Sequence, residues 1–253
     1  LFARRIKAYH EAHGLTESDL AHVSVKAYAN ANRNPLAHMK AVTMSHAQAA
    51  GEERNPKFLT NPDVKDFLKV SDCSQVSDGG AALILVSEAG LKQLGKSEHD
   101  AIEVLGLGHA TGNLFTDSDP LQMATTTAAA RAAYAQAGVD ADAVQLAEVH
   151  DCFTITELLM MEALGFAKPG EAMAQVLDGR TAITGALPIN TGGGLVGFGH
   201  PVGATGLKQI LEIYRQMKGA CGDYQVSNSP EIGMTANMGG DDKTAVVGLF
   251  ANR

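Results

Sequence analysis

A glycine-rich stretch constrains the fold of this chain more than any other feature of its sequence. Seven of the seventeen residues from Asn190 to Gly206 are glycine, and His200 stands among them with Pro201 directly behind it. Glycine lets backbone approach backbone or ligand where a Cβ atom would clash. Apolar residues then recur at helical spacing, at Leu207, Ile210, Leu211 and Tyr214. The pattern predicts a tight loop that holds His200 before a helix N-terminus, where free N–H groups stabilise negative charge.

Two other interpretations of this stretch stay open on these residues alone. A structural glycine turn around a satisfied histidine would carry no chemistry. A dinucleotide-binding fingerprint would begin at Gly197 and Gly199, but its third glycine comes one position late, at Gly203, and a histidine and a proline occupy the turn. A second stretch is needed to choose among the three.

That second stretch holds a histidine, an aspartate and a cysteine in consecutive positions. His150, Asp151 and Cys152 follow an apolar run that ends at Val149 and precede a helical pattern that ends at Gly165. Strand, turn and helix are therefore predicted, with three reactive side chains in the turn.

Together the two stretches resemble the thiolase family of acyl-CoA C-acyltransferases, and in particular its sterol-carrier-protein-type branch. That branch has His-Asp-Cys-Phe, here residues 150–153, where other thiolases have Asn-Glu-Ala-Phe, and both have Gly-His-Pro, here residues 199–201. The resemblance implies a layered α/β/α thiolase-like fold with a mixed, mainly parallel sheet. It also implies that 1–71 is the remnant of a loop domain, 72–100 the end of the N-terminal half and 101–253 the C-terminal half.

The resemblance assigns roles to five residues. His200 would activate the nucleophilic cysteine and donate to the enolate oxygen, and Cys152 would be the acid/base. His150 would hold the oxyanion-hole water or donate directly, the Gly239 backbone N–H would serve a second oxyanion hole, and Ser74 would lie near the pantetheine of coenzyme A. A thiol beside a helix N-terminus and histidines is expected to be exposed, with a lowered pKa.

Other positions near these motifs receive lesser roles. Asn237 stands where other thiolases have a catalytic cysteine, which is consistent with an acid/base at Cys152. Asp151 is expected to orient its turn and Phe153 to pack. Cys73 and Cys221 are expected to be inert.

The implied activity is thiolytic cleavage of 3-ketoacyl-CoA, or the reverse Claisen condensation, in fatty acid or sterol-type lipid metabolism. Acyl-CoA and CoA would be substrates, with no permanently bound cofactor and no metal, and a homo-oligomer, dimer or tetramer, is expected. The family's nucleophilic cysteine is expected upstream of Leu1, so these residues alone are expected to be inactive. The alternatives are a non-catalytic CoA-binding subunit and a thiolase-like aldolase that acts on steroid CoA esters.

Composition excludes several other classes of protein. Hydrophobic residues make up 45% and charged residues 19%, which is usual for a globular protein, and the net charge of −8 argues against a nucleic-acid partner. An odd count of three cysteines favours free thiols in a reducing compartment. We expect no membrane span, and a cytoplasmic location in a bacterium, with mitochondria or peroxisomes open in a eukaryote.

Alternating patterns along the chain predict helices on both faces of a sheet. A helix should end at Gly14, another should begin at Thr16, and an irregular region should run over 30–61. The further predicted helices are 87–95, 124–138, 156–165 and 204–219, and the predicted strands are 81–86, 102–108, 144–149, 182–187, 233–237 and 244–250.

Overall fold

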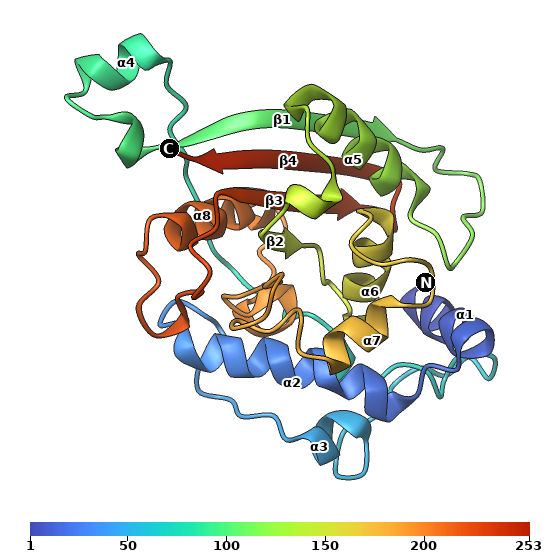
Figure 1. Ribbon diagram of the computed structural model, residues 1–253. Coiled ribbons are helices and arrows are strands. Elements are labelled where there is room, and N and C mark those ends of the chain that lie inside the picture. Colours follow the sequence, from blue (N-terminus) through green and yellow to red (C-terminus); the bar gives the residue numbers. More distant parts are fainter.

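Four strands, all after residue 101, form one mixed sheet in the computed structural model, which describes residues 1–253 (Figure 1). The strands are β1 (Ile102–Thr111), β2 (Leu146–Val149), β3 (Ile232–Gly239) and β4 (Thr244–Asn252), and their order across the sheet is β1-β4-β3-β2. The layered α/β fold predicted from the sequence is confirmed.

The pairing of the strands corrects one part of that prediction. Of the three neighbouring pairs only β2 with β3 is parallel, whereas β4 pairs antiparallel with both β3 and β1, so most of the strand pairing is antiparallel. The reason is the short connection from Gly239 to Thr244, which turns the chain directly back and makes β3 and β4 a hairpin. Parallel pairing needs a long crossover, and the connection from β2 to β3 provides one.

Helices cover both faces of the sheet. Helix α5 (Ala124–Ala137) lies against β1 and β4, and α8 (Thr205–Met217) packs on the opposite face against β2 and β3 (Figure 1). Two glycines of β1 allow the close approach of α5: a Cβ at Gly108 would lie 1.8 Å from the carbonyl oxygen of Ala129. Helix and sheet backbones therefore meet directly on this face.

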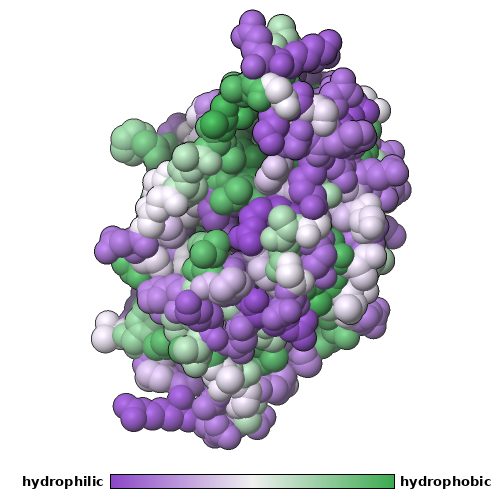
Figure 2. Space-filling model, turned by 90° about the vertical axis from the view of Figure 1, so that its left-hand side faces the viewer, coloured by the Kyte–Doolittle hydropathy of each residue, from purple (hydrophilic) through white to green (hydrophobic).

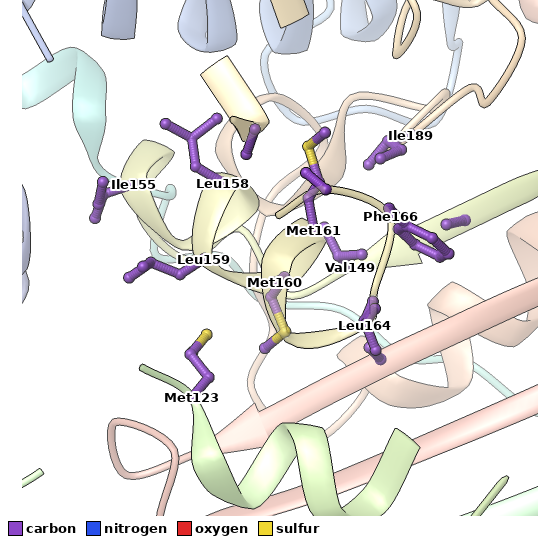
Figure 3. Close-up of a cluster of buried hydrophobic side chains, with 14 of the residues drawn as sticks. Met123, Val149, Ile155, Leu158, Leu159, Met160, Met161, Leu164, Phe166 and Ile189 are labelled. Carbon is purple, nitrogen blue, oxygen red and sulfur yellow. The ribbon is translucent and has the colours of Figure 1, made fainter. Parts of the chain in front are cut away.

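The main hydrophobic core surrounds α6 (Thr154–Ala163), which follows the His-Asp-Cys-Phe turn. Figure 3 shows its side chains packed among those of the neighbouring elements. The fully buried members on or next to α6 include Ile155, Leu158, Leu159, Met160, Met161 and Leu164. A helix that is apolar on nearly all sides belongs inside a protein, so the turn before α6 is held rigidly.

Helices from the first third of the chain lie below the sheet in Figure 1. They are α1 (Phe2–His13), α2 (Glu17–Arg33) and α3 (His46–Ala50). The predicted boundaries at Gly14, which has a left-handed φ of 74°, and at Thr16, which forms a capping box with Asp19, are confirmed. Two short helices complete the set, α4 (Glu88–Gln93), which was predicted, and α7 (Ala172–Leu177), which was not.

Two predicted strands are absent. Residues 81–86 are extended but unpaired, and Ile84 and Leu85 are each 85% exposed. No strand of residues 1–253 lies beside this segment, and an apolar run needs a neighbouring strand to form a sheet. Figure 2 shows hydrophobic side chains gathered near the top of this face, where Figure 1 places the segment leading to α4.

The second absent strand is 182–187. These residues form turns instead, closed by hydrogen bonds from the Gly185 N–H to the Ala182 carbonyl (2.8 Å) and from the Leu187 N–H to the Arg180 carbonyl (3.0 Å). The chain pairs with β2 only after this segment, through a single isolated bridge between Ala147 and Ile189. The apolar composition of this segment reflects burial under the core, not a strand.

No helix of the structure combines the length and the apolar character that crossing a membrane requires.

The β3–β4 hairpin also caps α5. Asp242 accepts hydrogen bonds from the backbone N–H groups of Thr125 and Thr126 (2.9 Å each) and from the Thr126 hydroxyl (2.6 Å). The residue at the N-cap position, Met123, offers no side-chain cap of its own.

We expect Asp242→Ala to lower the free energy of unfolding by about 1–2 kcal/mol, because free N–H groups at the start of α5 lose their acceptor. Chemical denaturation measures the change. Asp142→Ala, at an exposed position, is the matched control. Equal stability of the two variants would contradict the capping role.

Candidate active site

All five residues to which the sequence assigned a role line one cavity of about 610 Å³. They are Ser74, His150, Cys152, His200 and Gly239. Ser74 precedes the sheet in the chain, two of the others follow β2, His200 precedes α8, and Gly239 ends β3. Residues that are far apart in sequence therefore line one cavity at the carboxyl ends of β2 and β3. Open α/β folds bind ligands beyond the carboxyl ends of their strands.

His200 is oriented by the residue that begins α8. Its Nδ1 lies 2.7 Å from the hydroxyl oxygen of Thr205, and that hydroxyl donates to the carbonyl oxygen of Pro201 at 3.1 Å. Both contacts are hydrogen bonds only when Nδ1 carries the proton, so Nε2 keeps its lone pair. Partial burial lowers the pKa of His200. The ring is therefore a neutral base at physiological pH.

His150 faces His200 edge to face, with ring centroids 5.1 Å apart. Burial, and secondarily the positive charge that His200 could acquire, lower the pKa of His150 to about 3, against a weaker opposing hydrogen bond with Asn237. The side-chain nitrogen of Asn237 donates to Gln209 Oε1 at 3.0 Å, which fixes the orientation of the Asn237 amide. His150 is consequently a neutral hydrogen-bonding group.

Cys152 corrects the expectation of an exposed thiol with a lowered pKa. Its side chain is 7% exposed and belongs to the main hydrophobic core, and burial raises the pKa of the thiol to about 12. The hydroxyl of Thr156, whose oxygen is 3.9 Å from Sγ, opposes this rise only in part. Burial thus raises the pKa of the thiol by more than the N-terminus of α6 could lower it. The resting group is a protonated thiol, which can donate a proton.

A short extended segment holds the two motif turns side by side. The Ser74 N–H donates to the Cys152 carbonyl oxygen at 2.9 Å, and the His200 N–H donates to the Gln75 carbonyl oxygen at 3.0 Å. Isolated β-bridges of Cys73 with Phe153 and of Val76 with His200 belong to the same contact. Consecutive residues of one segment therefore set the spacing of Cys152 and His200.

Asp151 makes a second link between the two motifs, as its predicted orienting role requires. Its Oδ1 accepts a hydrogen bond of 2.6 Å from the Leu195 N–H in the glycine-rich stretch. A Cβ at Gly194, which has a left-handed φ of 59°, would lie 2.1 Å from the other carboxyl oxygen. Burial, and then the neighbouring Glu157, raise the pKa of this carboxyl well above its ordinary value.

Asn190 supports this arrangement and was not singled out from the sequence. It is one of few non-glycine residues with a positive φ, 57°. Its side-chain oxygen accepts from the Val149 N–H at 2.9 Å, and its side-chain nitrogen donates to Glu157 Oε2 at 3.2 Å. An asparagine at the head of a glycine run was the available signal, because asparagine tolerates left-handed backbone.

A buried ion cluster joins α8 to β2 beneath the cavity. Lys208 Nζ is 3.1 Å from Glu148 Oε2 and 3.6 Å from Glu212 Oε2, and Glu148 Oε1 accepts from the Thr191 N–H at 3.1 Å. Burial raises the pKa of Glu148 to about 7, although Lys208 opposes the shift. The cluster fixes the glycine-rich stretch at Thr191, whereas Asp151 fixes it at Leu195.

The β3–β4 hairpin closes the cavity on another side. Asp241 and Asp242 take left-handed φ values of 59° and 65°, a backbone conformation that glycine adopts more readily than aspartate. Each carboxylate has a partner that glycine could not serve: Asp241 binds Arg5 Nε at 2.7 Å, and Asp242 caps α5. Phe153 stacks on Phe2 with ring centroids 4.1 Å apart, as its predicted packing role requires.

The other two cysteines lie outside this cavity. Cys73 Sγ is directed to the Lys69 carbonyl oxygen at 3.5 Å, and Cys221 is buried beside Glu212. Burial raises the pKa of each thiol to about 12. Neither environment activates a nucleophile.

His150 gives the site a testable pH signature. Between pH 3 and 6.5 the unfolded chain binds a proton at this imidazole and the folded chain does not, so the free energy of unfolding falls as pH drops through that window. We expect His150→Asn to flatten this dependence by up to about 1.4 kcal/mol per pH unit. Denaturation between pH 4.5 and 6.5 measures it, with exposed His99→Asn as the control. Identical slopes for wild type and His150→Asn would show that His150 is not held neutral.

Comparison with known proteins agrees with this geometry. A family model described as thiolase C-terminal domain-like matches residues 106–252. An acetyl-CoA acetyltransferase of Methanothermobacter thermautotrophicus is 36% identical over 253 residues, which cover 99% of this chain and 62% of the relative. Sterol carrier protein 2 of Homo sapiens is 33% identical over 207 residues, which cover 80% of this chain and 38% of the relative.

A solved structure described as an Ltp2-ChsH2(DUF35) aldolase has the same fold. It superposes with a TM-score of 0.82 at 25% identity and covers 99% of this chain and 63% of that one. The chain thus spans less than two thirds of the length of each of these three proteins. It belongs to the thiolase family, in the sterol-carrier-protein-type branch.

Proposed function

We propose that the protein carrying this chain is an acyl-CoA C-acyltransferase of the thiolase type. It would cleave 3-ketoacyl-CoA with CoA or run the reverse condensation. The observation that carries the proposal is that a neutral histidine base, a second neutral histidine and a protonated thiol surround one cavity. A nucleophilic cysteine in a segment preceding Leu1, as the family resemblance implies, would complete the site.

In this proposal His200 acts first. Its Nε2 takes the proton of the nucleophilic thiol, and the thiolate attacks the 3-keto carbon of the substrate. The bond between carbons 2 and 3 then breaks, and its electron pair passes to carbon 2 as the enolate of the leaving acyl-CoA. CoA then attacks the acyl-enzyme, and the cysteine thiolate that leaves recovers its proton from His200.

Cys152 and His150 act on that enolate. The Cys152 thiol donates its proton to carbon 2, a role that suits a group protonated at rest, and recovers a proton from the incoming CoA thiol. His200 donates the proton that Nε2 has just gained in a hydrogen bond to the enolate oxygen, and a neutral His150 adds a second hydrogen bond, directly or through a water. The Gly239 backbone N–H would serve the second oxyanion hole, where glycine admits a close approach to the main chain.

A second candidate, a thiolase-like aldolase, is favoured by the aldolase described above with its TM-score of 0.82. Aldol cleavage of a 3-hydroxyacyl-CoA forms the same enolate and needs the same acid and the same oxygen donors. It begins with loss of the hydroxyl proton to a base and needs no acyl-enzyme. CoA is therefore a substrate for thiolysis only. Steroid CoA esters are one substrate class for this candidate. The third candidate function is that of a non-catalytic CoA-binding subunit.

The setting of the activity is part of the same proposal. The similarity to an acetyl-CoA acetyltransferase supports acyl-CoA and CoA as partners. Lipid metabolism as the context and a homo-oligomeric assembly follow from the family resemblance alone. Residues 1–71, 72–100 and 101–253 would be parts of a loop domain, an N-terminal half and a C-terminal half. The cysteine environments suit a reducing compartment such as the cytoplasm.

The test is CoA-dependent cleavage of 3-ketoacyl-CoA by the protein at its natural full length. We expect Cys152→Ala and His200→Ala each to lower kcat/KM by roughly 10²–10⁴, because each removes a proton-transfer group. Cys221→Ala and Cys73→Ala, outside the cavity, should stay near wild type.

Two outcomes would overturn this proposal. Cleavage of a 3-hydroxyacyl-CoA without added CoA, and none of the keto substrate, would assign the aldolase. Cleavage of the keto substrate that is lost in Cys73→Ala and kept in Cys152→Ala would place the chemistry at another cysteine.

A further inference from the structure

A second, basic pocket of about 230 Å³ adjoins the catalytic cavity. The two share Leu1, Gly240 and Asp241 in their walls. The start of α1, the loop between β1 and α5 and the β3–β4 hairpin form it, and Figure 1 shows the N-terminus and that loop on the same side of the molecule. A molecule in the catalytic cavity can therefore extend into this pocket.

Arg5 is the feature that points to a ligand. Its side chain is only 2% exposed, yet Nη2 has no hydrogen-bond partner. Nε binds Asp241 Oδ1 at 2.7 Å, and Nη1 donates to the carbonyl oxygens of Pro120 (2.9 Å) and Gln122 (3.1 Å). A buried charged group with an unsatisfied donor costs free energy. The guanidinium is thus fixed in the pocket wall with one nitrogen that no residue of the chain satisfies.

The remaining charges of the pocket favour an anion. Lys243 Nζ is held at 2.7 Å from both the Thr116 carbonyl oxygen and Ser118 Oγ, and Arg4 is exposed at the rim and forms no ion pair. The acidic residues are Asp241, which is paired with Arg5, and Asp117. Three cations against two carboxylates leave an excess of one positive charge.

We propose that this pocket binds a second anionic group of the acyl-CoA substrate, a carboxylate or a phosphate, while the thioester occupies the catalytic cavity. The inference rests on the proposed acyl-CoA function and narrows its substrate class. The exposed Arg4 guanidinium would bind such oxygens through paired hydrogen bonds, and Arg5, whose Nε and Nη1 are already engaged, would add Nη2 as a single donor. An acyl chain that ends in a carboxylate and the phosphates of CoA itself are the two sources of this chemistry.

Arg4→Gln in the protein at its natural full length tests the proposal, because Arg4 is exposed and its loss leaves the Arg5 contacts in place. The substrates are 3-oxoadipyl-CoA, which ends in a carboxylate, the neutral 3-oxohexanoyl-CoA, and the pantetheine thioester of each. We expect KM to rise about fivefold for the substrates that carry the recognised anion, equivalent to about 1 kcal/mol, with kcat unchanged. Arg131→Gln, at an exposed arginine of α5 away from both pockets, is the matched control.

The pattern across the substrates identifies the source. A rise confined to the two oxoadipyl substrates assigns an acyl carboxylate, and a rise confined to the two CoA esters assigns a phosphate. Arg5→Lys, which keeps the charge but loses the fork, should give the same pattern with a larger rise, and its thermal unfolding shows whether it is folded.

The proposal is overturned if KM for every substrate changes by less than twofold in Arg4→Gln and in folded Arg5→Lys. If no substrate is cleaved by the wild type, the proposed function has failed. Calorimetric binding of glutaryl-CoA and butyryl-CoA, with their pantetheine thioesters, then tests the pocket independently. Equal affinities of wild type and Arg4→Gln for all four would overturn it.

Discussion

The site depends on backbone hydrogen bonds that a single short segment makes to both motif turns. Through Ser74 and Gln75 this segment fixes the carbonyl of Cys152 and the N–H of His200 at adjacent residues. Backbone contacts of this kind hold position to a fraction of an ångström, which proton transfer between neighbouring groups requires. The carboxyl of Asp151 adds a side-chain link between the same turns, at Leu195. Neither turn can therefore move without the other.

Burial decides what chemistry these groups can perform. The same removal of water keeps His150 and His200 neutral and Cys152 protonated. A set of neutral donors and one neutral base is suited to an intermediate that carries its charge on the substrate, as an enolate does. Asp151 and the ion cluster of Glu148 and Lys208 lie behind the turns, so the charged groups of the region act on backbone position.

The sequence predicted the residues of the site better than their environment. The Gly-His-Pro and His-Asp-Cys-Phe motifs led to His150, Cys152 and His200, because each motif encodes a turn between regular elements. Ser74 and Gly239 were assigned from the family resemblance, and they line the same cavity. The prediction that Cys152 is exposed was wrong, because the position of a cysteine before a helix does not reveal the core residues that enclose its sulfur. The strands at 81–86 and 182–187 failed for a similar reason: an apolar run becomes a strand only beside a partner. The hairpin of β3 and β4, and the contacts of Asp241 and Asp242, depend on tertiary neighbours that spacing cannot show.

The central claim is that Cys152 and His200 work as one catalytic unit. A double-mutant cycle on kcat/KM for 3-ketoacyl-CoA cleavage, with Cys152→Ala, His200→Ala and the pair, tests it most directly. Groups that act as a unit give strongly non-additive losses. We expect the double variant to be no slower than the slower single variant, within about threefold. Losses that multiply in the double variant would show that the two side chains act independently and would contradict the single site described above.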